Sequence, residues 1–184
     1  MKVGNKKLVL FIIGILVLTS YLSFNVFRHL RNAKIINRTV DYLRDDNDRQ
    51  ENLKAAIELN GGNAKNTCVF FASGALRHGG LKVPLDTANT TQLTKYLISK
   101  GFKKYYNLKE LKVGDVCFTA PNGDKDEVPD HTYIFMGWVD LKCKDGYVCD
   151  NQKKGYGNSY HKRNITYETT INNEKKSIAI YYMR

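Results

Sequence analysis

The sequence lacks the cysteine spacings and the basic clusters that mark several common classes of protein. It has four cysteines: Cys68, Cys117, Cys143 and Cys149. No two of them form a Cys-x-x-Cys pair, so zinc-binding and thioredoxin-like chemistry are poorly supported, and neither a metal nor another cofactor is expected. The net charge of +11 comes from lysines and arginines scattered along the chain, without a long basic run. Nucleic acid is therefore not an expected partner.

A single long apolar run without charged residues covers residues 8–27. Because about 20 residues cross a bilayer as a helix, this run predicts one transmembrane helix after a basic tail at residues 1–7. The triplets at residues 19–21 and 23–25 are poor signal-peptidase sites, and no cysteine follows for lipidation. We therefore expect an uncleaved signal-anchor. The alternative is a cleaved signal peptide, which would leave a secreted protein.

Residues 28–50 predict a helical stalk ahead of a main domain at residues 51–184. One partly apolar face of this stalk is formed by Ile35, Ile36, Val40 and Leu43. The polar run at residues 45–48 is expected to interrupt the helix. It lacks the glycine and the later glutamate of an EF-hand loop, so it gives little reason to expect calcium.

Within the main domain, helical patterns come first and strand patterns follow. Helices are expected at residues 52–59, 68–77 and 91–100, and strands at residues 116–119, 132–139, 146–150 and 177–183. A hairpin near residues 142–146 joins the second and third strands. A disulfide between Cys143 and Cys149 across this hairpin is an alternative that the sequence leaves open. Gly114-Asp115 reads as a structural turn. The order predicts an α+β domain whose helices pack on one antiparallel sheet.

Cys68 lies where a loop rich in glycine and asparagine, residues 60–66, gives way to an apolar helix. Asn66 or Thr67 is a suitable N-cap for that helix. Unpaired N–H groups and the positive end of the helix dipole stabilise a thiolate at such a position. The pattern therefore predicts a cysteine of low pKa, although an inert cysteine packed in a buried helix fits it too.

His131 opens the second strand of the predicted sheet, and three polar residues, Asp150, Asn151 and Gln152, close the third. A hairpin between antiparallel strands would set these positions side by side. We expect His131 to take the thiol proton and one of the three to orient its ring, with Asp150 and Gln152 on one side of the strand and Asn151 on the other. The Cys68 N–H is one expected oxyanion donor, and Asn66 is a further candidate for this support.

The remaining histidines fit this role less well. His29 lies beside the apolar run, and His78 follows the Cys68 helix too far from its start to reach the thiol. His161 falls in a segment that reads as a polar loop, where it would at most border a cleft.

Taken in order, these motifs resemble the NlpC-like and CHAP (cysteine, histidine-dependent amidohydrolase/peptidase) papain-fold hydrolases. The motifs are Asn-Thr-Cys68, Leu-x-x-Gly114-Asp115-Val-x-Phe, Asp-His131-x-x-Ile-Phe-x-Gly-Trp and Val-x-Asp150-Asn-Gln. The resemblance covers roughly residue 53 to the end. It implies a papain-like fold with Cys68 as the nucleophile, His131 as the base and Asp150 as the third member. Thr67 departs from the family, because NlpC-like enzymes often have aspartate there.

The resemblance implies a single-pass membrane protein whose domain outside the cytoplasm cleaves amide bonds in peptidoglycan. The expected partners are peptidoglycan and other anionic wall polymers, to which a basic chain is attracted, and the membrane through residues 8–27. Two alternatives remain: a cysteine peptidase or amidase acting on proteins or lipids, and a wall- or partner-binding module without activity. The sequence leaves open whether the chain works within a larger envelope complex.

Overall fold

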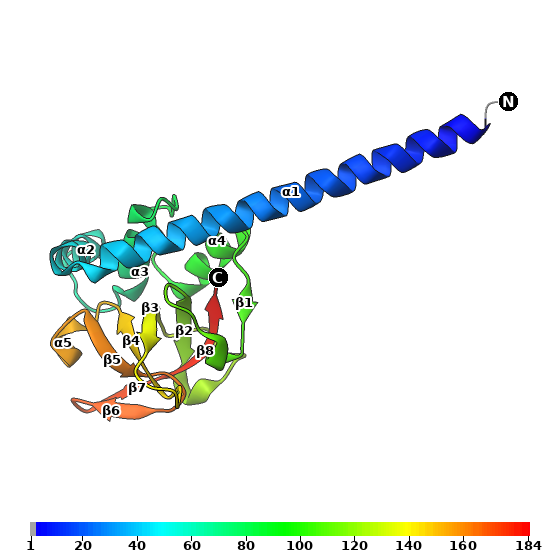
Figure 1. Ribbon diagram of the computed structural model, residues 1–184. Helices are drawn as coiled ribbons and strands as arrows, with labels where there is room; N and C mark the ends of the chain where they lie inside the picture. Colours follow the sequence, from blue (N-terminus) through cyan, green and yellow to red (C-terminus); the bar gives the residue numbers. More distant parts are fainter. Residues whose placement is uncertain (1–2) are drawn as a thin grey trace. The chain divides into compact units, whose positions relative to one another are not determined.

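A computed structural model describes the backbone of residues 3–184 and the side chains from Val9 onward (Figure 1). The chain divides into two compact units, one ending at Ala33 and the other running from Lys34 to Arg184. The basic tail expected at residues 1–7 lies outside the residues whose side chains are described.

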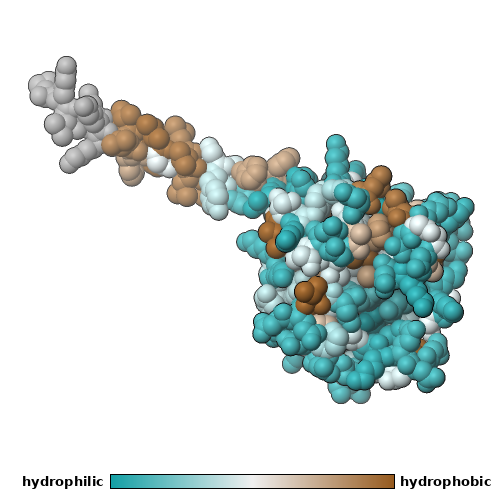
Figure 2. Space-filling view, turned by 180° about the vertical axis from the view of Figure 1, so that it is seen from behind, coloured by the Kyte–Doolittle hydropathy of each residue, from teal (hydrophilic) through white to brown (hydrophobic). Residues whose placement is uncertain are grey.

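The first unit consists of the greater part of helix α1 (Val3–Arg44). By length and composition this helix can cross a membrane, and it is the one candidate span among the residues described. The apolar side chains that follow Val9 are exposed, and Figure 2 shows the hydrophobic surface that they form on this part of the helix. Water disfavours so much exposed apolar area, which is consistent with a lipid environment.

The helices of the second unit are the end of α1, α2 (Asp46–Leu59), α3 (Cys68–His78), α4 (Thr90–Ser99) and α5 (Lys153–Tyr156), with short 3-10 turns at η1 (Leu108–Glu110) and η2 (Pro121–Gly123). The interruption expected at residues 45–48 is present, since Asp45 caps α2 by accepting the Asp48 N–H at 3.0 Å. The unit begins at Lys34, ahead of the expected boundary at residue 51, because the apolar face of the expected stalk is part of its core.

The main sheet has six strands in the order β1-β8-β2-β3-β4-β5, and every neighbouring pair is antiparallel. They are β1 (Lys104–Tyr105), β2 (Val116–Ala120), β3 (His131–Trp138), β4 (Asp145–Cys149), β5 (Tyr160–Asn164) and β8 (Ile178–Met183). A separate hairpin joins β6 (Thr169–Ile171) to β7 (Glu174–Lys176). The four expected strands correspond to β2, β3, β4 and β8.

The expectation of a polar loop around His161 was wrong, because this residue lies in β5. Two of the strand's inward side chains are polar, His161 and Arg163, and both are buried. A strand usually shows itself through apolar residues at alternate positions, and β5 has little such signal.

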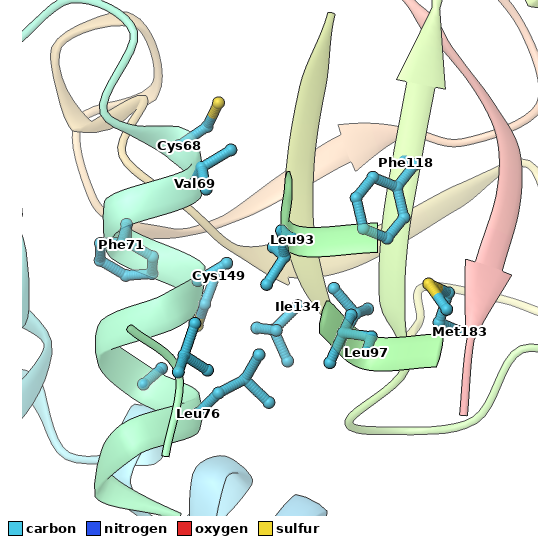
Figure 3. Packing of buried hydrophobic residues seen from close by; sticks show 14 of the residues in the cluster. Cys68, Val69, Phe71, Leu76, Leu93, Leu97, Phe118, Ile134, Cys149 and Met183 are labelled. Carbon is cyan, nitrogen blue, oxygen red and sulfur yellow. The ribbon is translucent and has the colours of Figure 1, made fainter. Parts of the chain in front are cut away.

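The larger core lies between the helices and one face of the main sheet (Figures 1 and 3). Residues of α3 and α4 meet side chains of β2, β3 and β8, including Phe118, Ile134 and Met183. A second cluster on other strand positions includes Cys117, Tyr133 and Tyr182. The second unit is therefore an α+β assembly of helices on an antiparallel sheet.

Gly114 fixes the contact between α1 and the turn that leads into β2. Its φ is +93°, and a β-carbon added there would lie 2.2 Å from Cγ2 of Ile36 and 3.0 Å from Cγ2 of Val40. The next residue, Asp115, is buried and pairs with Arg184 at 2.6 Å. Gly114 and Asp115 therefore both stabilise the packing around this turn, as expected for a structural turn.

Candidate active site

Helix α3 begins at Cys68, as the sequence predicts. Thr67 occupies the N-cap position, but its hydroxyl donates to the Ala64 carbonyl at 3.1 Å and does not cap the helix. Asn66 takes up the left-handed backbone conformation just before it, with φ 58°. In Figure 3 the sulfur of Cys68 points beyond the end of the helix and away from the hydrophobic cluster.

His131 and Asp150 meet as the hairpin between β3 and β4 predicts. The two strands pair with Ile134 opposite Cys149, which brings the start of β3 to the end of β4. His131 Nε2 lies 2.8 Å from Asp150 Oδ2, and both side chains are buried. Asp150, rather than Asn151 or Gln152, therefore contacts the imidazole.

Asp150 is held in place from three further directions. The backbone N–H of Gln152 donates to Oδ1 at 2.7 Å, and Arg163 Nη1 lies 3.6 Å from Oδ2 while donating to Gln152 Oε1 at 3.1 Å. His161 Nε2 lies 3.8 Å from Oδ1, and its ring stacks on Tyr156. These contacts explain how a strand with polar inward residues is buried: its side chains surround a buried carboxylate.

Charge interactions at the site favour a thiolate–imidazolium pair. Burial opposes ionisation of Asp150, but its hydrogen bond to His131 and the nearby cations lower its pKa to about 2. Burial also opposes protonation of His131, but the hydrogen bond to Asp150 and the interaction with Cys68 raise its pKa to about 9. For Cys68, the hydrogen bond and the charge of His131 outweigh burial and lower the thiol pKa.

The other cysteines have different surroundings. All four thiols are free, so the open alternative of a disulfide between Cys143 and Cys149 is not formed. Burial raises the pKa of both Cys117 and Cys149, which makes them poor nucleophiles. Cys149 Sγ faces the Leu43 carbonyl at 3.8 Å, inside the core, while Cys143 is half-buried on the hairpin.

A cavity of about 160 Å³ opens beside Cys68 and His131. Its other lining residues are Asn66, Asp130, Asn151, Gln152, Arg163, Lys175, Lys176 and Ser177.

The expectation that Asn151 and Gln152 lie on opposite sides of a strand was wrong, because both residues line the cavity. Strand β4 ends at Cys149, so the alternation of a strand does not extend to them. In the part of the chain that the structure describes, no His, Cys, Asp and Glu side chains form a group of three placed to hold a metal ion.

Sequence reasoning missed Arg163, which contacts both Asp150 and the cavity. The signal that pointed to it was weak but present: His161 and Arg163 are two positions apart, as inward residues of a strand are.

Comparisons of the chain with family models, with curated proteins and with solved structures found no match.

Proposed function

We propose that this chain is a membrane-anchored cysteine hydrolase of papain-like fold that cleaves amide bonds of peptidoglycan outside the cytoplasm. The observation that carries the proposal is the buried His131–Asp150 hydrogen bond of 2.8 Å beside Cys68, which begins a helix and has a lowered pKa. A thiol, a base and a group that orients the base are the three parts that covalent acyl transfer requires.

In this mechanism the Cys68 thiolate attacks the carbonyl carbon of the amide. The backbone N–H of Cys68 at the start of α3 donates to the oxyanion that forms. The C–N bond breaks as His131 gives its proton to the leaving amine, and a thioester remains on Cys68. His131 then accepts a proton from water, which attacks the thioester and releases a carboxylate. Asp150 keeps the imidazole oriented and stabilises its protonated form.

The substrate class is supported by charge and by the N-terminal helix. The chain carries a net charge of +11, and three cationic side chains, Arg163, Lys175 and Lys176, line the cavity. Peptidoglycan and its attached polymers are anionic, so such a chain is attracted to them. An apolar span in α1 would keep the hydrolase at the membrane, close to the wall.

The proposal is tested by incubating the detergent-solubilised full chain with purified peptidoglycan and identifying released fragments by mass spectrometry. New fragments are expected from the native chain, and their masses identify the bond that is cut. Protein treated beforehand with iodoacetamide is expected to release none. If neither sample releases fragments and both bind the wall, the chain is a binding module. If neither binds, substrates of the protein or lipid class replace peptidoglycan.

Changing Asp150 to asparagine is expected to move the alkaline limit of activity. Leaving-group protonation needs the imidazolium form of His131, so kcat/KM should fall above about pH 9, the pKa to which Asp150 and Cys68 raise this histidine. In Asp150→Asn the limit should shift down toward about 6.5, the ordinary value for imidazole. The loss of kcat/KM at pH 7 should be smaller than the loss of about 10²- to 10⁴-fold expected for His131→Ala.

The measurement is the pH dependence of kcat/KM from pH 5 to 10. The matched control is Gln152→Ala, which keeps the backbone N–H that donates to Asp150. Its alkaline limit should stay near that of the native chain. An unchanged limit in Asp150→Asn would show that this carboxylate does not set the pKa of His131.

A further inference from the structure

The β6–β7 hairpin holds an exposed carboxylate, Glu174, in an ion pair with a buried lysine, Lys176. Lys176 Nζ donates to Glu174 Oε2 at 2.7 Å. The Glu174 side chain is 73% exposed, whereas that of Lys176 is only 4% exposed. The hydrogen bond from Lys176 lowers the pKa of Glu174, and the charges of Lys65 and Lys154 lower it further. These lysines come from three segments: the loop before Cys68, helix α5 and strand β7.

The same hairpin forms part of the wall of the cavity that contains Cys68. Lys175 and Lys176 line this cavity together with the buried Arg163. The acidic residue among the lining side chains is Asp130, whose carboxylate already accepts the hydroxyls of Thr119 at 2.6 Å and Ser177 at 2.5 Å. The cavity is therefore positively charged on the side where the hairpin lies.

Packing gives the buried ammonium a fixed position. Asn172, in the turn between β6 and β7, donates from Nδ2 to the Gly155 carbonyl of α5 at 3.1 Å. The Lys176 ammonium lies 5.7 Å from the centre of the Tyr156 ring, also in α5. A buried ammonium without an anionic partner is costly, which explains why the chain supplies a carboxylate of its own.

We propose that Lys176 forms a subsite for a carboxylate that lies near the amide to be cut, and that Glu174 occupies it until substrate replaces it. The inference rests on the proposed function and names the substrate class more narrowly, as amides with a neighbouring free carboxylate. Exchange keeps the buried ammonium paired, because the substrate carboxylate takes the place of Glu174, whose exposed side chain returns to water. The ammonium stays paired before and after.

The test compares two alkylating reagents that differ in a single group. Iodoacetate carries a carboxylate and iodoacetamide a carboxamide; each forms an S–C bond at Cys68 and releases iodide. The protein is the detergent-solubilised full chain with Cys143→Ser, which removes the half-buried thiol. The measured quantity is the ratio of the iodoacetate rate to the iodoacetamide rate at Cys68.

Lys176→Met should lower this ratio about threefold to tenfold, and Glu174→Gln should raise it by a similar factor. High salt should reduce these differences. Glu174→Gln changes an exposed residue, so it remains informative if Lys176→Met does not fold. Lys109→Met removes the same charge from η1, away from the cavity lining, and should leave the ratio unchanged.

Equal ratios in all these variants would overturn the subsite. A rise in Lys176→Met would overturn it as well. Alkylation needs no turnover, so this result is separate from the fragment assay. The subsite can fail while peptidoglycan is still cut, and it can hold while no peptidoglycan is cut.

Discussion

Cys68→Ala is expected to release no peptidoglycan fragments while it unfolds at nearly the same urea concentration as the native chain. The thiolate of Cys68 is the group that forms the covalent bond, and none of the surrounding side chains replaces it. The substitution removes one sulfur at the first position of α3 and leaves the apolar face of the helix intact. Its effect on the free energy of unfolding should be about 1 kcal/mol or less.

The matched control is Cys117→Ala. Cys117 is fully buried in β2, and burial raises its pKa. This variant loses the same atom type from the interior and should keep its hydrolytic activity. Fragments released by Cys68→Ala would remove the thiol from the mechanism. Equal loss in both variants would point to a folding defect rather than to lost chemistry.

Gly114→Ala is expected to destabilise the second unit strongly. The new β-carbon would overlap with Ile36 of α1, and the φ of +93° is unfavourable for any residue with a side chain. Backbone strain and overpacking each cost about 1–3 kcal/mol, so the combined loss in the free energy of unfolding should be about 2–6 kcal/mol.

The control for this prediction is Gly62→Ala. Gly62 also has a positive φ, +83°, but nothing lies within 4 Å of an added β-carbon. It should show the cost of backbone strain alone, about 1–2 kcal/mol. Urea unfolding of the three proteins in the same detergent measures both values. Equal losses in the two variants would show that Ile36 moves aside without cost.

The central contact of the site could be predicted because it depends on neighbouring parts of the chain. His131 begins β3 and Asp150 directly follows β4, and one hairpin joins these two strands; Cys68 starts a helix with a clear apolar face. Alternating apolar residues and a short connection determine such positions locally. The family resemblance favoured Asp150, with Asn151 and Gln152 left open. The residue pattern alone could not decide among them, because β4 ends at Cys149 and strand alternation does not extend to these three positions.

Two features depended on distant contacts and were not predictable in this way. Strand β5 is buried because His161 and Arg163 surround the charge of Asp150, and no local apolar pattern marks such a strand. The apolar face of residues 34–44 was visible, but its place in the core of the second unit depends on distant residues, including Gly79 and Gly114, which approach the helix closely.

The packing of residues 34–44 in the core also limits where proteolysis could separate the second unit from the apolar part of α1. Helix α1 continues through Lys34, and the residues just beyond it, including Ile35 and Ile36, belong to the hydrophobic core. A protease that cuts before Lys34 would leave the compact unit whole. A cut further along would remove a wall of the core and open the turn at Gly114 to water. Proteolysis can therefore release the second unit intact only if α1 is cut before Lys34.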